Sequence, residues 1–167
     1  SPLRQVAVAV VSAVGGVTDS LASSLRLAVD GDGAAYRSTI ASLLELHTAI
    51  AKELLPHDER GAQTLAEVTE ELKRDTSDIL ALLRATAITR SYDMHMFQVV
   101  TSYGELWSSL ILWAFISHSL SSNGTTTPTD ISAGGDSGGA GSASVSSRCL
   151  RLDARQVLVV ERAPGAP

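Results

Sequence analysis

Cysteine is nearly absent from this 167-residue chain, which contains only Cys149. A single cysteine excludes an intramolecular disulfide framework and a cysteine-rich zinc site. A basic cluster is also lacking, because the net charge is −5 and the lysines and arginines are scattered. These features exclude a general affinity for nucleic acid or for an anionic membrane surface.

A helix that spans a bilayer takes roughly 20 predominantly apolar residues. The most apolar stretch, 106–120, is shorter and is interrupted by serines and a histidine. We therefore predict a buried helix there. Hydrophobic residues make up 44% of the chain and charged residues 19%, which is typical of one globular domain with a substantial core.

The N-terminal region combines a strand-like run with a glycine turn. Residues 6–11 are all valine or alanine, which predicts a strand buried on both faces, as in a parallel sheet. Gly15 and Gly16 then permit a sharp turn before an amphipathic helix pattern. The free amides of such a helix, beside the hydroxyls of Ser12 and Thr18, favour a site for phosphate or carboxylate. A turn without a ligand fits the local pattern equally well.

After this turn the sequence predicts several helices and then a final pair of strands. We predict a mostly parallel sheet flanked by helices, an α/β fold in which strand 148–152 lies beside strand 4–11. Residues 121–147 are rich in Ser, Gly and Thr and predict a disordered low-complexity insertion. The predicted strands are 4–11, 148–152 and 157–160, and the predicted helices are 17–29, 34–55, 62–87, 93–101 and 105–120.

The histidines and methionines favour packing over metal binding. His47 lies on an apolar helix face, where a core histidine is a better explanation than a catalytic one. Met94, His95 and Met96 have no further soft ligand nearby in the sequence, so we predict no metal site. His118, near a predicted helix end, fits a favourable interaction with the helix dipole.

Two acidic residues are candidates for a binding site. Glu105 opens the most apolar helix, where the helix dipole alone favours a carboxylate; it could instead face a cleft and bind an amino group. Asp153 follows a predicted strand, and ligands gather at the carboxyl ends of parallel strands. A local salt bridge between Asp153 and Arg155 is the simpler alternative.

Three segments, in order, resemble the aspartate kinase family of the amino-acid kinase superfamily. VVSAVGGVTD at 10–19 is similar to the family pattern V-V-S-A-x-x-x-V-T-[DN], and YGELWS at 103–108 is similar to its G-E-x-x-S motif. LDARQVLV at 152–159 resembles its D-[AVT]-R-x-[VL] segment. The GELWS wording is closest to the plant and algal bifunctional aspartate kinase–homoserine dehydrogenases.

The resemblance implies a partial three-layer amino-acid kinase fold over 1–167, containing the aspartate-binding part of the domain. The intact enzyme would transfer the γ-phosphate of ATP to the β-carboxylate of L-aspartate, in lysine, threonine and methionine biosynthesis. Ser12, Thr18 and Glu105 would bind aspartate, with Glu105 pairing with its α-ammonium group. The pocket would also include Gly15, Gly16 and Asp153, which are therefore counted as further candidates.

The resemblance also implies partners and a location. ATP and Mg²⁺ would serve the intact enzyme, which would be a homo-oligomer in the plastid stroma, or in the cytoplasm outside photosynthetic eukaryotes. NADP would be needed only if a homoserine dehydrogenase half follows. We expect no nucleic-acid or membrane partner.

The sequence also departs from the family. The Lys-Phe-Gly-Gly-Thr-Ser motif, whose lysine supports the transferred phosphate, is missing from these 167 residues, as is the nucleotide-binding half. We therefore expect a fragment of a longer protein that is inactive alone and contains no catalytic residue. The alternatives are a monofunctional aspartate kinase, a catalytically dead remnant and a non-catalytic helical interaction module.

Overall fold

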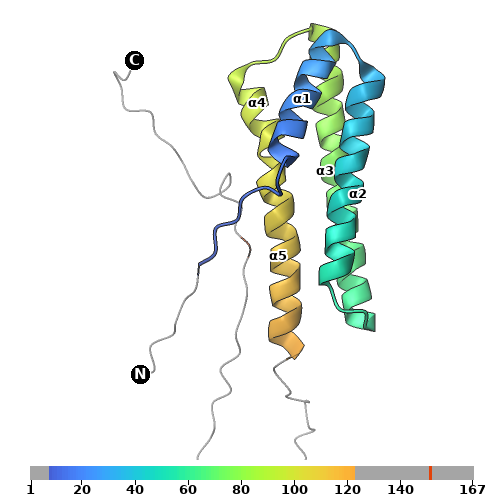
Figure 1. Cartoon of the computed structure of the whole chain (residues 1–167), viewed down its shortest axis with the longest axis vertical. Coiled ribbons are helices and arrows are strands. Elements are labelled where there is room, and N and C mark those ends of the chain that lie inside the picture. The colour runs from blue at the N-terminus through green and yellow to red at the C-terminus, as the bar shows by residue number, and fades with distance from the viewer. Residues whose placement is uncertain (1–7, 123–150, 152–167) are drawn as a thin grey trace, which may run out of the picture.

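The computed structural model describes residues 8–122 and residue 151. Within that part, α2 and α3 run side by side, and α1 packs against both of them (Figure 1). The helix α5 packs against α1, α2 and α3, and α4 joins it to the far end of α3. The helices are α1 (Val17–Asp30), α2 (Gly33–Leu54), α3 (Glu59–Thr89), α4 (Met94–Thr101) and α5 (Tyr103–Ser122).

The predicted α/β fold is wrong for the residues that the structure describes, which form helices and contain no strand. Residues 8–11 belong to the predicted first strand, yet they are not in a strand, and Val8 and Val10 are 84% and 95% exposed. A strand needs a partner for its backbone hydrogen bonds and a surface to cover its side chains. The predicted partner strands 148–152 and 157–160 lie outside the described residues, except for Arg151.

The helix predictions for 17–29, 34–55 and 62–87 are confirmed, with small differences at the ends. Local chemistry explains these ends. Gly31 ends α1 in the left-handed conformation, and Asp32 begins α2 by accepting a hydrogen bond from the Ala35 amide at 3.0 Å. Asp side chains at an N-cap satisfy amides that have no partner in the helix.

Two more aspartates cap helices in the same way. Asp58 accepts from the Gly61 amide at 2.6 Å at the start of α3, and Asp93 accepts from the Met96 amide at 2.8 Å at the start of α4. The Asp58 cap explains why α3 begins before residue 62, the start predicted from the sequence.

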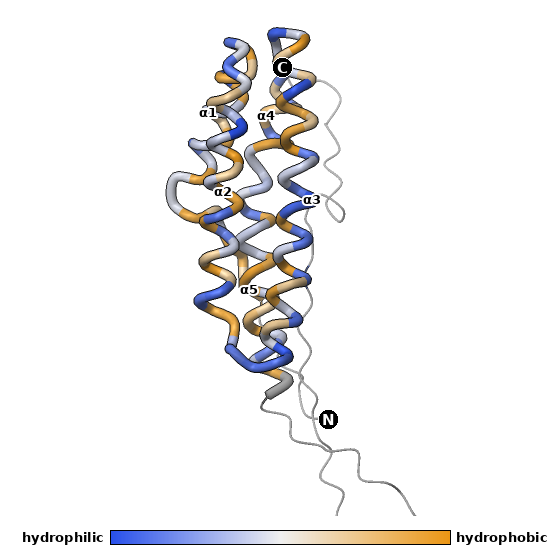
Figure 2. Tube along the Cα trace, turned by 90° about the vertical axis from the view of Figure 1, so that its right-hand side faces the viewer, coloured by the Kyte–Doolittle hydropathy of each residue, from blue (hydrophilic) through white to orange (hydrophobic). Residues whose placement is uncertain are grey.

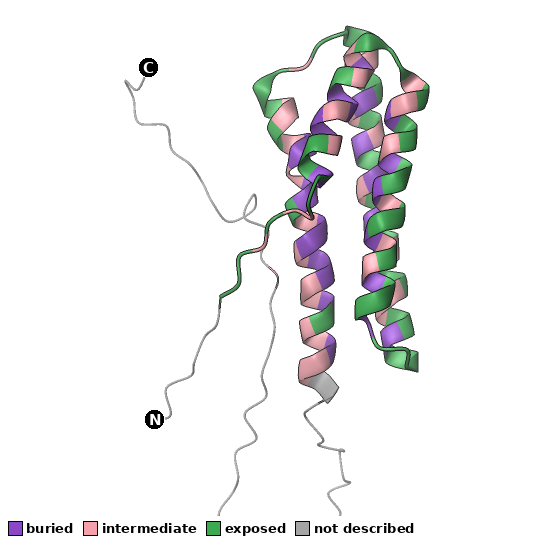
Figure 3. Cartoon of the chain, viewed as in Figure 1, coloured by how far each residue is buried: buried purple, intermediate pink, exposed green. Residues whose placement is uncertain are grey.

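The core lies where apolar stripes of the helices face one another (Figure 3). On α3 the stripe recurs at helical spacing through Val68, Leu72, Ile79 and Leu83, all of which are buried. The buried partners on the other helices include Leu21, Leu25, Tyr36, Ile40, Leu43, Trp107, Leu110 and Ile111.

The apolar region of α4 and α5 has one short interruption at Ser102, and the helices predicted at 93–101 and 105–120 are confirmed with small differences at their ends. Figure 2 shows hydrophobic residues along much of α5. By length and composition, Met94–Leu120 could cross a membrane, and 44% of its most apolar window is buried inside the bundle. As predicted, one face of α5 is buried, whereas Phe115 is 37% exposed.

Candidate functional site

The N-termini of α1 and α5 meet at Gly104. A Cβ atom at this buried glycine would lie 2.8 Å from the Ala13 Cβ and 3.2 Å from the Val17 Cγ1. The Thr18 Oγ1 would lie 3.8 Å away. Because real Cβ atoms are essentially never as close as 2.8 Å, a glycine is needed for this approach. The segments 10–19 and 103–108, far apart in the sequence, therefore converge at one point.

Three predicted site residues surround this contact and are exposed. Ser12 directly precedes Ala13, Thr18 directly follows Val17, and Glu105 directly follows Gly104. Each polar residue is thus a chain neighbour of a residue in the contact. The arrangement offers two hydroxyl groups and one carboxylate to solvent in the same region of the surface.

The glycine turn leaves its backbone accessible. Gly16 is the N-cap of α1, with φ 81° in the left-handed region, and no side chain caps the first turn among the described residues. Cβ atoms at Gly15 and Gly16 would meet nothing within 4 Å. The Val17 amide donates to the Val14 carbonyl oxygen at 3.0 Å, so the amides of Thr18 and Asp19 are the ones left for a ligand at this turn. Asp153, the remaining predicted pocket residue, lies outside the described residues.

A partly buried polar contact lies about one turn further along α5. Trp107 is 1% exposed, and its Nε1 donates a hydrogen bond to Asp75 Oδ2 at 3.1 Å, which joins α5 to α3. The His47 ring on α2 packs against Trp107 in an edge-on geometry, with ring centroids 4.8 Å apart. The Tyr103 ring lies on another side of Trp107, 6.1 Å away between centroids.

Sequence reasoning missed this contact. Asp75 follows Lys73 and Arg74 in a charged part of the sequence, which is typical of a solvated helix face, yet Asp75 is partly buried. One signal was present in the sequence: Asp75 lies three residues after Leu72 and four before Ile79, on the apolar stripe of α3.

Burial shifts the titration of both groups near Trp107. Burial raises the pKa of Asp75, and the Trp107 hydrogen bond opposes that rise. Burial lowers the pKa of His47, against the effect of its bond to the Leu43 carbonyl. His47 is fully buried, so the prediction of a core histidine is confirmed.

The neutral His47 ring makes one hydrogen bond in the described part of the chain. Its Nδ1 lies 2.7 Å from the Leu43 carbonyl oxygen, so the proton is assigned to Nδ1. The Nε2 atom is buried and has no hydrogen-bond partner among the described residues.

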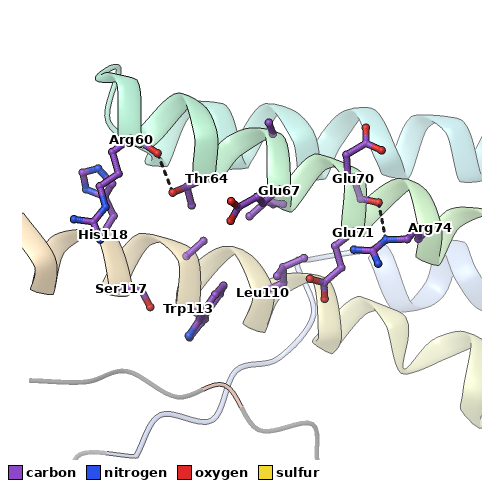
Figure 4. A pocket seen from close by; sticks show the side chains of 13 residues that line it. Arg60, Thr64, Glu67, Glu70, Glu71, Arg74, Leu110, Trp113, Ser117 and His118 are labelled. Carbon is purple, nitrogen blue, oxygen red and sulfur yellow. Dashed lines mark hydrogen bonds between the residues drawn. The ribbon is translucent and has the colours of Figure 1, made fainter.

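A separate groove of about 610 Å³ lies between α3 and the C-terminal half of α5 (Figure 4). Charged side chains of α3, among them Arg60, Glu67 and Arg74, form one side, and Trp113 of α5 forms part of the other. This groove begins at Leu110 on α5. It therefore does not include the Gly104 contact.

His118 lines one end of this groove and has a partner on another helix, which the helix-dipole interpretation did not include. His118 is 6% exposed, and its Nε2 lies 3.3 Å from Oδ1 of Asp58, the N-cap of α3. It thus contacts a neighbouring helix and not only the end of its own. Nowhere in 8–122 or at residue 151 do three or more potential metal ligands gather, and His95 and Met94 are exposed.

The comparisons connect the chain with enzymes of the aspartate pathway. It is 35% identical over 103 residues to the chloroplastic bifunctional aspartokinase/homoserine dehydrogenase 2 of Arabidopsis thaliana, covering 62% of this chain and 11% of that protein. It is 28% identical over 151 residues to the corresponding enzyme 1 of Zea mays, covering 90% of this chain and 13% of that protein. No family model and no solved structure matches the chain.

The chain therefore spans only about one tenth of the length of these curated relatives. The similarity shows homology to a short part of bifunctional aspartokinase/homoserine dehydrogenases. These relatives are enzymes, and their names place them in the chloroplast.

Proposed function

We propose that this chain is part of the aspartate kinase portion of a bifunctional enzyme and forms one wall of its aspartate site. The observation that supports this most strongly is the contact of Gly104 with Ala13 and Val17, which brings together the first turns of α1 and α5, where Thr18 and Glu105 lie. The order of the three family-like segments and the similarity to bifunctional aspartokinases support the same proposal.

In this proposal each polar group has a role matched to its chemistry. The Glu105 carboxylate accepts charge-assisted hydrogen bonds from the α-ammonium group of L-aspartate. The Thr18 hydroxyl and the amides of Thr18 and Asp19 in the first turn of α1 donate to a carboxylate of the substrate, where the helix dipole favours negative charge. Ser12 lies beside the same turn, and Asp153 remains a predicted member of the pocket.

The phosphate chemistry belongs to other parts of the intact enzyme. Phosphoryl transfer requires positioning and neutralisation of the charge that develops on the phosphate. The groups proposed here position an amino acid, and ATP and Mg²⁺ are bound elsewhere in the proposal. We therefore expect the 167-residue chain to show no turnover alone. Plastid location and a dehydrogenase half that uses NADP are part of the proposal, supported by the names of the relatives.

Steady-state kinetics of the full-length protein test this proposal. Glu105→Ala is compared with Glu45→Ala, because Glu45 is exposed on α2 and far from the turn in sequence. Loss of a charge-assisted bond costs about 1.5–3 kcal/mol, so we expect the KM for aspartate to rise roughly 10- to 150-fold in Glu105→Ala and to stay unchanged in Glu45→Ala. An unchanged KM in both variants would refute the role of Glu105.

A non-catalytic helical interaction module is the second candidate. The observations that favour it are that the regular elements among the described residues are all helices and that a groove lies between α3 and α5. The kinetic experiment on the full-length protein distinguishes the aspartate site from an interaction module. If the second candidate is right, the full-length protein shows no aspartate-dependent turnover.

A further inference from the structure

The contact among Trp107, Asp75 and His47 gathers one residue from each of three helices at one point of the bundle, where Trp107 and His47 are buried and Asp75 is partly buried. Asp75 of α3 accepts the indole hydrogen bond of Trp107 from α5 at 3.1 Å. His47 of α2 packs against the same indole at 4.8 Å between ring centroids. Trp107 is 1% exposed and His47 is fully buried, so neither side chain can swing into solvent without opening the bundle.

This contact is directional, unlike the packing of the aliphatic core residues. Aliphatic side chains tolerate small slides and rotations of a helix, because contacts of similar volume can replace one another. An indole has a single N–H donor fixed in the ring plane. The bond to Asp75 therefore restrains the rotation of α5 about its own axis, and the His47 ring restrains the indole from another side.

Helical geometry connects that rotation with Glu105. Successive residues turn by about 100°, so Glu105, two residues before Trp107, points about 200° away from it. When Trp107 faces the core, Glu105 therefore faces solvent, and Glu105 is indeed exposed. Gly104 lies about 60° from the direction of Trp107 and is buried against Ala13 and Val17.

We infer that the Trp107–Asp75 hydrogen bond, supported by His47, holds α5 in the rotation that packs Gly104 against Ala13 and Val17 and leaves Glu105 exposed next to that contact. Trp107, Asp75 and His47 are then positioning residues for the amino-acid site, and they do not touch the substrate. The substrate part of this inference rests on the proposed function. The orientation of Glu105 is independent of it and is tested separately.

The first test measures aspartate kinetics in the full-length protein. Trp107→Phe keeps an aromatic ring but removes the donor, and Asp75→Leu removes the acceptor. Both should raise the KM for aspartate by roughly tenfold or more, since small misplacements of a binding group are costly, and leave the KM for ATP unchanged. Asp75→Asn keeps an oxygen acceptor and should stay near wild type. Asp78→Leu is the matched control, because Asp78 is exposed on the same helix.

Two results distinguish positioning from general stability. A positioning role changes the KM for aspartate selectively, whereas a purely structural role lowers the amount of folded enzyme and leaves both KM values unchanged. If Trp107→Phe and Asp75→Leu keep the wild-type KM for aspartate while Glu105→Ala raises it, the positioning role is refuted and the proposed function stands.

The second test does not require aspartate. Glu105→Cys in a Cys149→Ser background carries the only thiol of this chain, and its reaction rate with a soluble disulfide reagent reports the exposure of position 105. Adding Trp107→Phe should change that rate severalfold, and adding Asp78→Leu should not. An unchanged rate with Trp107→Phe would refute the inference even if the full-length protein shows no aspartate kinase activity.

Discussion

Gly104 faces Ala13 so closely that a Cβ at residue 104 would lie 2.8 Å from the Ala13 methyl carbon. This relationship brings the glycine turn at the start of α1 to the start of α5. The distance leaves no room for a side chain, so the residue type at 104 determines how closely the starts of α1 and α5 approach.

The first prediction therefore concerns the size of residue 104. Gly104→Ala should destabilise the protein by about 1–2 kcal/mol. Overpacking typically costs about 1–3 kcal/mol, and the higher helix propensity of alanine offsets part of that cost. Urea unfolding measures the change. Adding Ala13→Gly should restore most of the stability by making room for the new methyl group. If the double variant is no more stable than Gly104→Ala, the contact is not the cause.

The second prediction concerns the pH dependence due to Asp75. Burial raises the pKa of this carboxyl in the folded state above its ordinary value of 3.8. The folded protein therefore holds the Asp75 proton more strongly than the unfolded chain does. The stability that this contributes is present below pH 3.8 and is lost as the pH rises from 3.8 through the raised folded pKa. The difference in unfolding free energy between wild type and Asp75→Asn should fall across this window. A difference that is flat or rises with pH would contradict the shift.

The third prediction has the opposite sign and concerns His47. Burial lowers the pKa of His47 in the folded state below its ordinary value of 6.5. The unfolded chain binds the His47 proton more strongly than the folded protein does. Stability is therefore greatest above pH 6.5 and is lost as the pH falls from 6.5 toward the lowered folded pKa. His47→Leu should remove this loss. Denaturation of both proteins between about pH 8 and about pH 5 measures it, and equal slopes would contradict it.

The fourth prediction tests a helix cap away from the site. Asp93 caps α4 through its bond to the Met96 amide. Asp93→Ala should cost about 1 kcal/mol of stability, whereas Asp93→Asn should cost little, because asparagine caps equally well. Thermal unfolding compares the two variants. Equal losses for alanine and asparagine would show that charge, and not the capping hydrogen bond, is responsible.

The helices could be predicted from the sequence because their signals are local. The stripe of Val68, Leu72, Ile79 and Leu83 and the capping residue Asp32 each act within one or two turns. The strand prediction for 4–11 failed in its described part for the opposite reason. A valine-rich run has strand propensity, but a strand requires a partner elsewhere in the chain, and local pattern does not supply one.

The candidate site could be predicted only in part. The motifs indicated that Thr18 and Glu105 belong together, and the contact at Gly104 is consistent with that. The hydrogen bond between Trp107 and Asp75 was not predictable, because it joins helices whose relative rotation depends on the whole core. The roles of Ser12, Thr18, Glu105 and Asp153 in binding remain predictions.

The most direct test of the central proposal compares the binding of L-aspartate with that of succinate, which has the same two carboxylates but no ammonium group. If Glu105 binds the α-ammonium group, the full-length wild-type protein should prefer aspartate strongly, and Glu105→Gln should lose most of that preference while still binding succinate. Calorimetric titration measures both ligands. A preference for aspartate that is unchanged in Glu105→Gln would contradict the proposal.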